Sequence, residues 1–254
     1  MAQLSIRASI IETLYDRGYV KERSIQATPI GISLIYTLEK HCPVIIDEKL
    51  TRDFEIIVID DGSKDNSRQV LKKLAKKYRQ LKLVFHEKNQ GYGGALRSGF
   101  KTASKDLIFY TDGDGQYNVK ELPILLSLLT EDADIINGIK MSRHDPTYRV
   151  FIGNLYSFVA RWLFFLPIYD VDCDFRLIRG SVLKKLNLES NSGSICVELV
   201  KKTQRSGAKF RQVSVHHLER KWGQSQFFRI DRLLTTFFEL GKLWIKLMII
   251  DKIK

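Results

Sequence analysis

The stretch IFYTDGDGQYNVKEL, from Ile108 to Leu122, runs from a β-prone apolar segment directly into an acidic turn. Asp112-Gly113-Asp114-Gly115 is poor material for a continuing strand. Carboxylates at positions i and i+2 of an extended segment share a face, and a turn brings both within reach of one cation. A polar turn stabilised by aspartate side chains is the alternative for an isolated Asp-x-Asp pair.

Outward from this stretch, strand-like and helix-like segments alternate. Strands are expected at 54–61, 81–87, 106–112 and 133–139, and helices at 65–78, 93–103 and 118–130. The alternation predicts an α/β fold with a mostly parallel sheet flanked by helices. In such sheets, ligands bind beyond the carboxyl ends of the strands, so Asp60-Asp61 and Asp112-Asp114 are expected to face one crevice. This placement favours a cation site over a simple polar turn.

The composition limits the classes of partner. The 254 residues, 44% of them hydrophobic, allow one large domain or two small ones. The net charge of +12 indicates an anionic partner, such as a phosphate-bearing ligand, nucleic acid or an anionic membrane. The three cysteines form no Cys-x-x-Cys pair, so neither a disulfide framework nor a zinc site is predicted.

Three further motifs carry polar chemistry. Asn89 to Gly94 (NQGYGG) departs from the dinucleotide fingerprint, and its glycines, Gly91 among them, allow close backbone approach to a ligand or to the sheet. Asp170 to Arg176 (DVDCDFR) is interpreted as a salt-bridged turn. Arg220 to Ser225 (RKWGQS) offers the donors that a phosphate or diphosphate needs. Ser63 or Asp65 is expected to cap the following helix.

Six segments, taken in order, resemble the family 2 glycosyltransferases of the GT-A fold. They are EIIVIDDGSKDNS, NQGYGGALRSGF, YTDGDGQY, INGIKMSRHD, DVDCDFRLIRG and HHLERKWGQS. The chain looks most like the branch that moves a sugar from a nucleotide donor to a polyprenyl phosphate. The implied partners are a UDP- or GDP-linked sugar, a lipid phosphate and an anionic membrane surface, with no specific nucleic acid expected.

The resemblance also implies roles for individual residues. It implies Mg²⁺ or Mn²⁺ bound by Asp112, Asp114 and Gln116, and catalytic roles for Asp114, Arg143 and Arg220. It implies that the donor contacts Asp60, Asp61, Ser63, Gly91 and Asp112, and that the acceptor phosphate contacts Arg143, Arg149, Arg220 and Ser225. A lipid phosphate is already anionic at pH 7, so the acceptor needs no strong general base.

The chain departs from this family at its N-terminal end. The family's first, apolar strand is not recognisable, so it is expected to be missing or replaced. Residues 8–55 instead resemble a fragment of a type IA DNA topoisomerase without the catalytic tyrosine motif. We therefore expect a small helical segment at 1–53 without topoisomerase activity, followed by a glycosyltransferase domain at 54–230. Ile30 to Tyr36 and Val44 to Asp47 are the candidates for the place of the first strand.

The C-terminal residues 231–254 predict an amphipathic helix at a membrane surface. No window reaches the ~20 nearly uncharged residues of a membrane span. Polar residues recur at helical spacing in Asp231, Thr235, Glu239, Lys242 and Lys246, and Asn154, Ser157 and Arg161 form a similar stripe. Ordinary burial against the sheet is the alternative. Together these features predict a peripheral enzyme at the cytoplasmic membrane face. The rivals are a non-specific nucleic-acid binder and a catalytically inactive truncated fusion.

Overall fold

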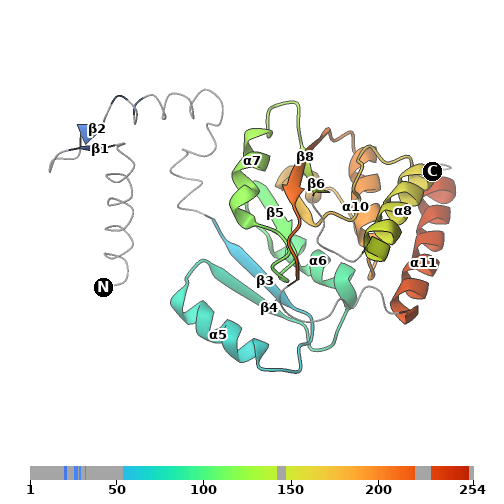
Figure 1. The fold of residues 1–254 in the computed structure, drawn as a ribbon. Helices are drawn as coiled ribbons and strands as arrows, with labels where there is room; N and C mark the ends of the chain where they lie inside the picture. Colours follow the sequence, from blue (N-terminus) through green and yellow to red (C-terminus); the bar gives the residue numbers. More distant parts are fainter. Residues whose placement is uncertain are drawn as a thin grey trace. The chain divides into compact units, whose positions relative to one another are not determined.

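The computed structural model describes residues 20–21, 26–27, 29, 32, 54–141, 147–220 and 230–251, without the side chains of 20–21, 26–27, 147–149, 151 and 230–234. The chain divides into two compact units, Met1–Asp53 and Phe54–Lys254 (Figure 1). In the first unit, β1 (Val20–Lys21) pairs antiparallel with β2 (Gln26–Ala27). The predicted helical character of this unit, its topoisomerase-like origin and the two candidates for the first strand concern residues that lie almost entirely outside the described ones.

The second unit has an α/β fold with two sheets. β3 (Ile56–Asp60) and β4 (Leu81–Phe85) form a parallel pair that α5 (Ser67–Lys77) connects. The other sheet has the order β5-β7-β6-β8, with bounds Leu107–Thr111, Phe175–Arg179, Ile135–Met141 and Phe210–His216. β7 runs antiparallel to both of its neighbours, whereas β6 and β8 are parallel. The predicted α/β class is confirmed, and the sheet pairings of the described residues in this unit are mixed, two parallel and two antiparallel.

Helix α6 (Gly91–Thr102) spans the break between the two sheets. A side chain at Gly99 would contact Ile59 of β3, and the Phe100 ring packs edge-on against Tyr110 of β5 with centroids 5.4 Å apart. Both strands therefore lie against the same helix. Among the described residues, no strand pairs with the second edge of β3 or of β5. The open edges lie in the N-terminal half of the domain, where the first strand was expected to be missing.

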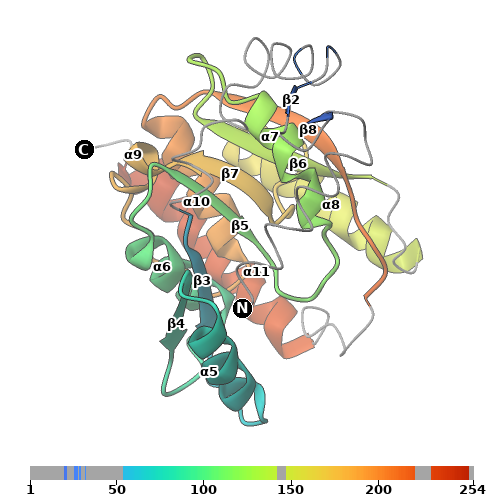
Figure 2. The same ribbon diagram turned by 90° about the vertical axis from the view of Figure 1, so that its left-hand side faces the viewer.

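The remaining helices cover the four-stranded sheet (Figure 2). They are η1 (Val119–Glu121), α7 (Leu122–Ser127), α8 (Thr147–Phe164), α9 (Gly180–Leu183), α10 (Ser194–Arg205), α11 (Ile230–Trp244) and the π-helix η2 (Ile245–Ile250). Buried side chains of α8, α10, α11 and η2, such as Phe164, Val197, Leu243 and Leu247, form one apolar cluster. No helix of the described residues is both long and apolar enough to cross a bilayer.

A polar row crosses the middle of the four-stranded sheet. Arg176 of β7 lies opposite Tyr110 of β5 and Asn137 of β6. Its fully buried guanidinium donates to the Tyr110 hydroxyl at 2.8 Å and to Asn137 Oδ1 at 2.5 Å. Arginine stays protonated even when buried. The row therefore fixes a permanent positive charge inside the sheet.

Candidate functional site

The two acidic strand ends meet at the first turn of α6. The Asp61 carboxylate, just after β3, accepts hydrogen bonds from the backbone amides of Gln90 at 2.8 Å and Gly91 at 2.9 Å. The next residue, Tyr92, places its buried hydroxyl close enough to Asp112, just after β5, to lower the pKa of that carboxyl. Both strand ends therefore adjoin one helical turn, as the sequence indicates.

Asp60 and Asp61 are both engaged by the protein. Asp60 is buried and accepts from the Ser63 amide at 3.2 Å and from Arg68 Nε at 2.7 Å. Burial raises its pKa, but these hydrogen bonds outweigh burial and leave the pKa below its usual value. Asp61 also pairs with Nδ1 of His86 at 2.7 Å. Their contacts fix the β3 end of the site, and the donor contacts assigned to Asp60, Asp61, Ser63 and Gly91 stay predictions.

A cluster of carboxylates surrounds Asp112. Burial, followed by the charges of Asp174, Asp114 and Asp172, raises the pKa of Asp112 well above its usual value. Burial and Asp172 likewise raise the pKa of Asp174 to about 6. Side-chain oxygens of Asp172 and Asp174 lie within 4.8 Å of each other and of the Cys196 sulfur. Like charges are thus crowded in a buried place, which favours the binding of a cation.

The register of β5 and β7 explains this crowding. Thr111, the last residue of β5, lies opposite Phe175, the first residue of β7. Because the two strands are antiparallel, the end of β5 lies beside the start of β7, so Asp112 and Asp174 lie next to each other at the same end of this strand pair. The interpretation of Asp170 to Arg176 as an ordinary salt-bridged turn missed this proximity. An antiparallel neighbour so far along the chain leaves no local signal in the sequence.

Three described cations lie at the cluster. Lys140 Nζ lies 3.5 Å from Asp170 and 3.6 Å from Asp172, and the charge of Arg176 lowers the pKa of Asp174. The third cation is Arg220, which pairs with Asp114. These three cations lie among five aspartates, namely Asp170, Asp172, Asp174, Asp112 and Asp114. Among the described residues, Asp112 has no ion pair.

The predicted metal ligands Asp114 and Gln116 already hold a positive group. Arg220 Nη2 donates to Asp114 Oδ2 at 2.6 Å and to Gln116 Oε1 at 2.9 Å. Gln116 is buried, and its Nε2 donates to the Leu218 carbonyl at 3.2 Å, which orients its oxygen towards the guanidinium. Two oxygen atoms therefore converge on one cationic nitrogen. Such oxygen donors, with Asp112 beside them, suit Mg²⁺ or Mn²⁺.

The predicted acceptor-phosphate residues are mostly outside the described part of the chain. Arg143 and Ser225 lie in the undescribed segments, and Arg149 is in α8 without a described side chain. Arg220 is the member of that set with a described side chain. The site also includes Tyr92, Lys140, Asp174 and Arg176, for which the sequence analysis assigned no role at this position.

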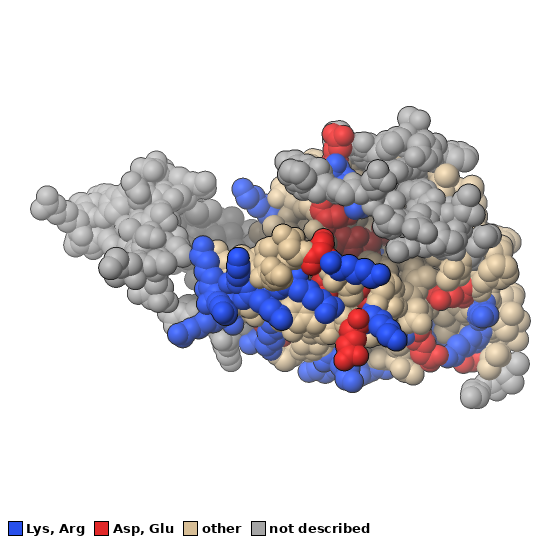
Figure 3. All heavy atoms as spheres, turned by 90° about the horizontal axis from the view of Figure 1, so that it is seen from below, with Lys and Arg blue, Asp and Glu red and all other residues tan. Residues whose placement is uncertain are grey.

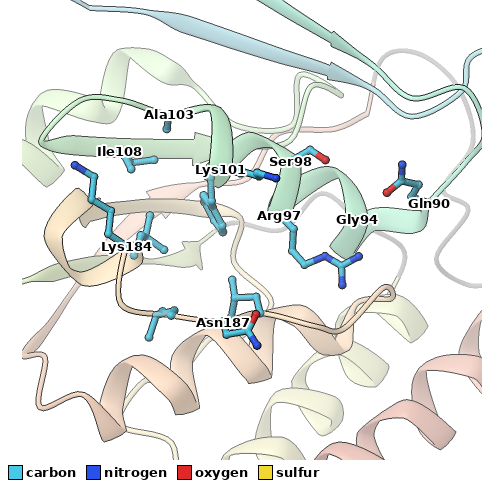
Figure 4. A pocket seen from close by; sticks show the side chains of 13 residues that line it. Gln90, Gly94, Arg97, Ser98, Lys101, Ala103, Ile108, Lys184 and Asn187 are labelled. Carbon is cyan, nitrogen blue, oxygen red and sulfur yellow. The ribbon is translucent and has the colours of Figure 1, made fainter.

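A cavity of about 560 Å³ lies between α6 and the segment after α9 (Figure 4). Its walls carry the basic residues Arg97, Lys101 and Lys184 and no acidic residue. Without carboxylates it does not suit a divalent cation. The carboxylate cluster at the strand ends is therefore the candidate active site.

The surface carries a separate basic face. Lysine and arginine side chains gather over α5, whose Lys72, Lys73, Lys76 and Lys77 are exposed (Figure 3). Exposed charge of this kind attracts anionic surfaces without selecting among them. The face is therefore compatible with a membrane and equally with nucleic acid.

Comparison with known proteins gives one family. The family model described as glycosyl transferase family 2 matches residues 45–186. Undecaprenyl-phosphate 4-deoxy-4-formamido-L-arabinose transferase of Yersinia enterocolitica is 26% identical over 213 residues, which cover 81% of this chain and 64% of the relative. The Yersinia pestis protein of the same name matches equally. The chain thus spans less than two thirds of these curated relatives.

Solved structures share the fold. A mannosyltransferase from Pyrobaculum calidifontis, in complex with GDP-Man and Mn²⁺, has a TM-score of 0.53 at 16% identity. The match covers 81% of this chain and 60% of the mannosyltransferase chain. Glucosyl-3-phosphoglycerate synthase from Mycobacterium tuberculosis, in complex with Mn²⁺, UDP and glucosyl-3-phosphoglycerate, has a TM-score of 0.57 at 16% identity. This match covers 83% of this chain and 73% of the synthase chain. At these identities the likeness establishes the GT-A fold.

Proposed function

The chain belongs to glycosyl transferase family 2, and on that basis we propose that it transfers a sugar from a nucleotide-sugar donor to a polyprenyl-phosphate lipid with the help of a divalent metal. One observation carries the metal site, namely the convergence of Asp114 and Gln116 on a cation beside Asp112, whose pKa is raised by burial and by neighbouring carboxylates. The named relatives act on undecaprenyl phosphate, which supports the lipid acceptor. Two structural neighbours were solved with Mn²⁺ and a nucleotide ligand, which supports the donor class.

We propose separate roles for the residues that bind the metal, the donor phosphates and the first turn of α6. Asp112, Asp114 and Gln116 would hold Mg²⁺ or Mn²⁺, which neutralises the charge of the departing nucleoside diphosphate. Arg220 is the described cation beside these ligands, and it can donate to a phosphate through its planar fork. The contacts of Asp61 hold the first turn of α6 against the β3 end, where the donor is proposed to lie. The acceptor phosphate supplies its own anionic nucleophile.

Two helices support a location at a membrane surface. α8 exposes Phe158 (67%) and Trp162 (70%), and α11 exposes Phe237 (72%) and Phe238 (66%). Some polar residues of these helices face inwards, since Ser157 is buried and Glu239 accepts hydrogen bonds from Ser192 and Ser194. Others, such as Asn154, Thr235 and Lys242, are exposed beside the aromatic residues. Large aromatic side chains exposed in this number mark an interaction surface, and aromatic beside polar residues suits the membrane interface. We therefore place both helices at the interface of the cytoplasmic leaflet, where the lipid phosphate lies.

Isothermal titration calorimetry with UDP- and GDP-sugars tests the proposal. Heat of binding is expected in the presence of Mn²⁺ and not in EDTA. Asp114→Asn should weaken this binding at least tenfold, because a charged ligand of the metal is lost. Asp132→Asn, which removes an exposed carboxylate paired with Arg211, is the matched control and should bind normally.

The same titration separates the rival interpretations. Equal binding with and without metal, or unchanged binding by Asp114→Asn, would remove the metal role. No binding of any nucleotide sugar by a folded protein would support the inactive fusion. Retention on DNA that disappears at moderate salt, without nucleotide binding, would support the nucleic-acid binder and the basic face of α5 as its contact.

A further inference from the structure

Arg220 takes the two ligand atoms that a divalent metal would need. One guanidinium nitrogen satisfies both Asp114 Oδ2 and Gln116 Oε1. A metal ion bound to the same oxygens would meet this positive group at the same place, and two cations repel each other strongly at such short range. The side chain of Arg220 must therefore move before both oxygens can bind a metal.

We infer that Arg220 is an exchangeable internal cation, which neutralises Asp114 and Gln116 in the free protein and passes to the diphosphate of the donor when the metal binds. The inference rests on the proposed function. It assigns Arg220 a task beyond contact with phosphate, because the same side chain controls access to the metal site. Metal and donor then bind as a coupled pair.

The surroundings of Arg220 allow this exchange. Its side chain is 29% exposed and that of Asp114 is 17% exposed, so water can replace the contact. Arg176 provides the contrast, because its guanidinium is fully buried and donates to four separate acceptors. A partly exposed ion pair is weak and is readily exchanged, whereas a buried and fully bonded arginine is not.

The backbone before Arg220 is anchored, so the side chain can move without the strand. The Leu218 amide donates to the Gln116 carbonyl at 2.7 Å, and the Gln116 side chain donates back to the Leu218 carbonyl. Tyr117 and His217 form an isolated antiparallel bridge at the same point. These contacts hold Arg220 beside the metal ligands in either position of its side chain.

The exchange has a thermodynamic consequence. Metal alone must displace the guanidinium, which is then left without its anionic partner. A nucleoside diphosphate bound at the same time offers that guanidinium a new anion. Each ligand therefore raises the affinity of the other, and linkage requires the two factors to be equal. Removal of the guanidinium should strengthen binding of metal alone and reduce the coupling.

Titration of the full chain with Mn²⁺, followed by the electron paramagnetic resonance signal of free Mn²⁺, tests the inference. Each titration is run without and with saturating UDP or GDP. Arg220→Ala should bind Mn²⁺ alone roughly fivefold tighter than the wild type. The enhancement of Mn²⁺ affinity by the nucleotide should shrink by a similar factor. Arg211→Ala removes an arginine that pairs with Asp132, and it should behave like the wild type.

Arg220→Gln provides a second variant, since it removes the charge but keeps a polar side chain beside Asp114. It should also tighten binding of Mn²⁺ alone, which decides the matter if Arg220→Ala does not fold. Unchanged or weaker Mn²⁺ binding by the folded variants would overturn the exchange. This outcome differs from failure of the proposed function, in which the wild type itself would show no coupling between Mn²⁺ and nucleotide.

Discussion

Replacement of Asp174 by asparagine should stabilise the metal-free protein at neutral pH. Asp174 is buried, with 8% of its surface exposed, beside Asp112 and Asp172, and its pKa in the folded protein is raised to about 6 from the usual 3.8. The folded state therefore binds the proton more tightly than the unfolded state does. The stability gained from protonation is complete below pH 3.8 and is lost as the pH rises through about 6. Asparagine has a similar shape and carries no charge at any of these pH values.

The magnitude follows from the displacement of this pKa. Each pH unit between the folded and unfolded values corresponds to about 1.4 kcal/mol, so ionisation of Asp174 costs about 3 kcal/mol at pH 7. At pH 4.5 the carboxyl is protonated in the folded state, and the cost falls to about 1 kcal/mol. The stability advantage of Asp174→Asn over the wild type should thus be about 2 kcal/mol larger at pH 7 than at pH 4.5. The loss of its charge also lowers the pKa of Asp112, which acts in the same direction.

Urea denaturation at pH 4.5 and pH 7.0, in buffer with EDTA, measures this difference. Asp132→Asn serves as the control, because Asp132 is exposed and Arg211 and Thr130 lower its pKa. That variant should gain no stability at pH 7. An advantage of Asp174→Asn that is the same at both pH values, or a loss of stability at pH 7, would refute the electrostatic account of the cluster.

Two further predictions concern packing and surface. Gly93→Ala should destabilise the protein by about 3 kcal/mol in urea denaturation, because its new Cβ would lie 2.2 Å from the Ser190 carbonyl oxygen. Gly241→Ala is the control and should be neutral or stabilising, because the space around Gly241 is open. Equal stability of the two variants would contradict the packing of α6. The double variant Trp162→Ser/Phe237→Ser should bind anionic liposomes at least tenfold more weakly than the wild type in sedimentation assays. Val70→Ser, which changes an exposed residue of α5, is the control and should not change binding. Undiminished sedimentation of the double variant would exclude the aromatic residues of α8 and α11 as the membrane-binding surface.

Local sequence pattern predicted the elements whose cause is local. The alternation of apolar runs and amphipathic segments gave β3 to β6 with α5 and α6 within a few residues. The segment 118–130 was predicted as one helix, but the structure has a 3₁₀ turn and a short α-helix, with Pro123 in the first turn of that helix. Neither Ser63 nor Asp65 is the N-cap of α5, which is Asn66, although Asp65 accepts a hydrogen bond from the Ser67 amide.

Features that depend on distant partners were not predictable in this way. Nothing in β7 indicates that it runs antiparallel between β5 and β6, yet this register brings Asp174 to Asp112 and Arg176 to Tyr110. A pattern of apolar residues specifies that a strand is buried, but it does not specify its neighbour. The Asp112-x-Asp114 pair was recognised from its position after a strand. The crowding that raises the pKa of Asp112 became evident only from the pairing of strands.

The break between the two sheets divides the site into two halves, and we expect these halves to differ in local stability. Asp112, Asp174 and Arg176 lie on β5 and β7 or at their ends, within one hydrogen-bonded sheet, and Arg220 follows the adjoining β8 segment. The β3 end, with Asp60 and Asp61, is joined to this sheet mainly through α6, by hydrogen bonds at its first turn and by apolar contact at Gly99. Among the described residues, no strand pairs with the second edge of β3 or of β5, and backbone groups that lack a partner at such an edge lower local stability. Any impairment of this chain should therefore weaken contacts made by the β3 end and spare the metal ligands, so that Mn²⁺ binding persists even where nucleotide-sugar binding is poor.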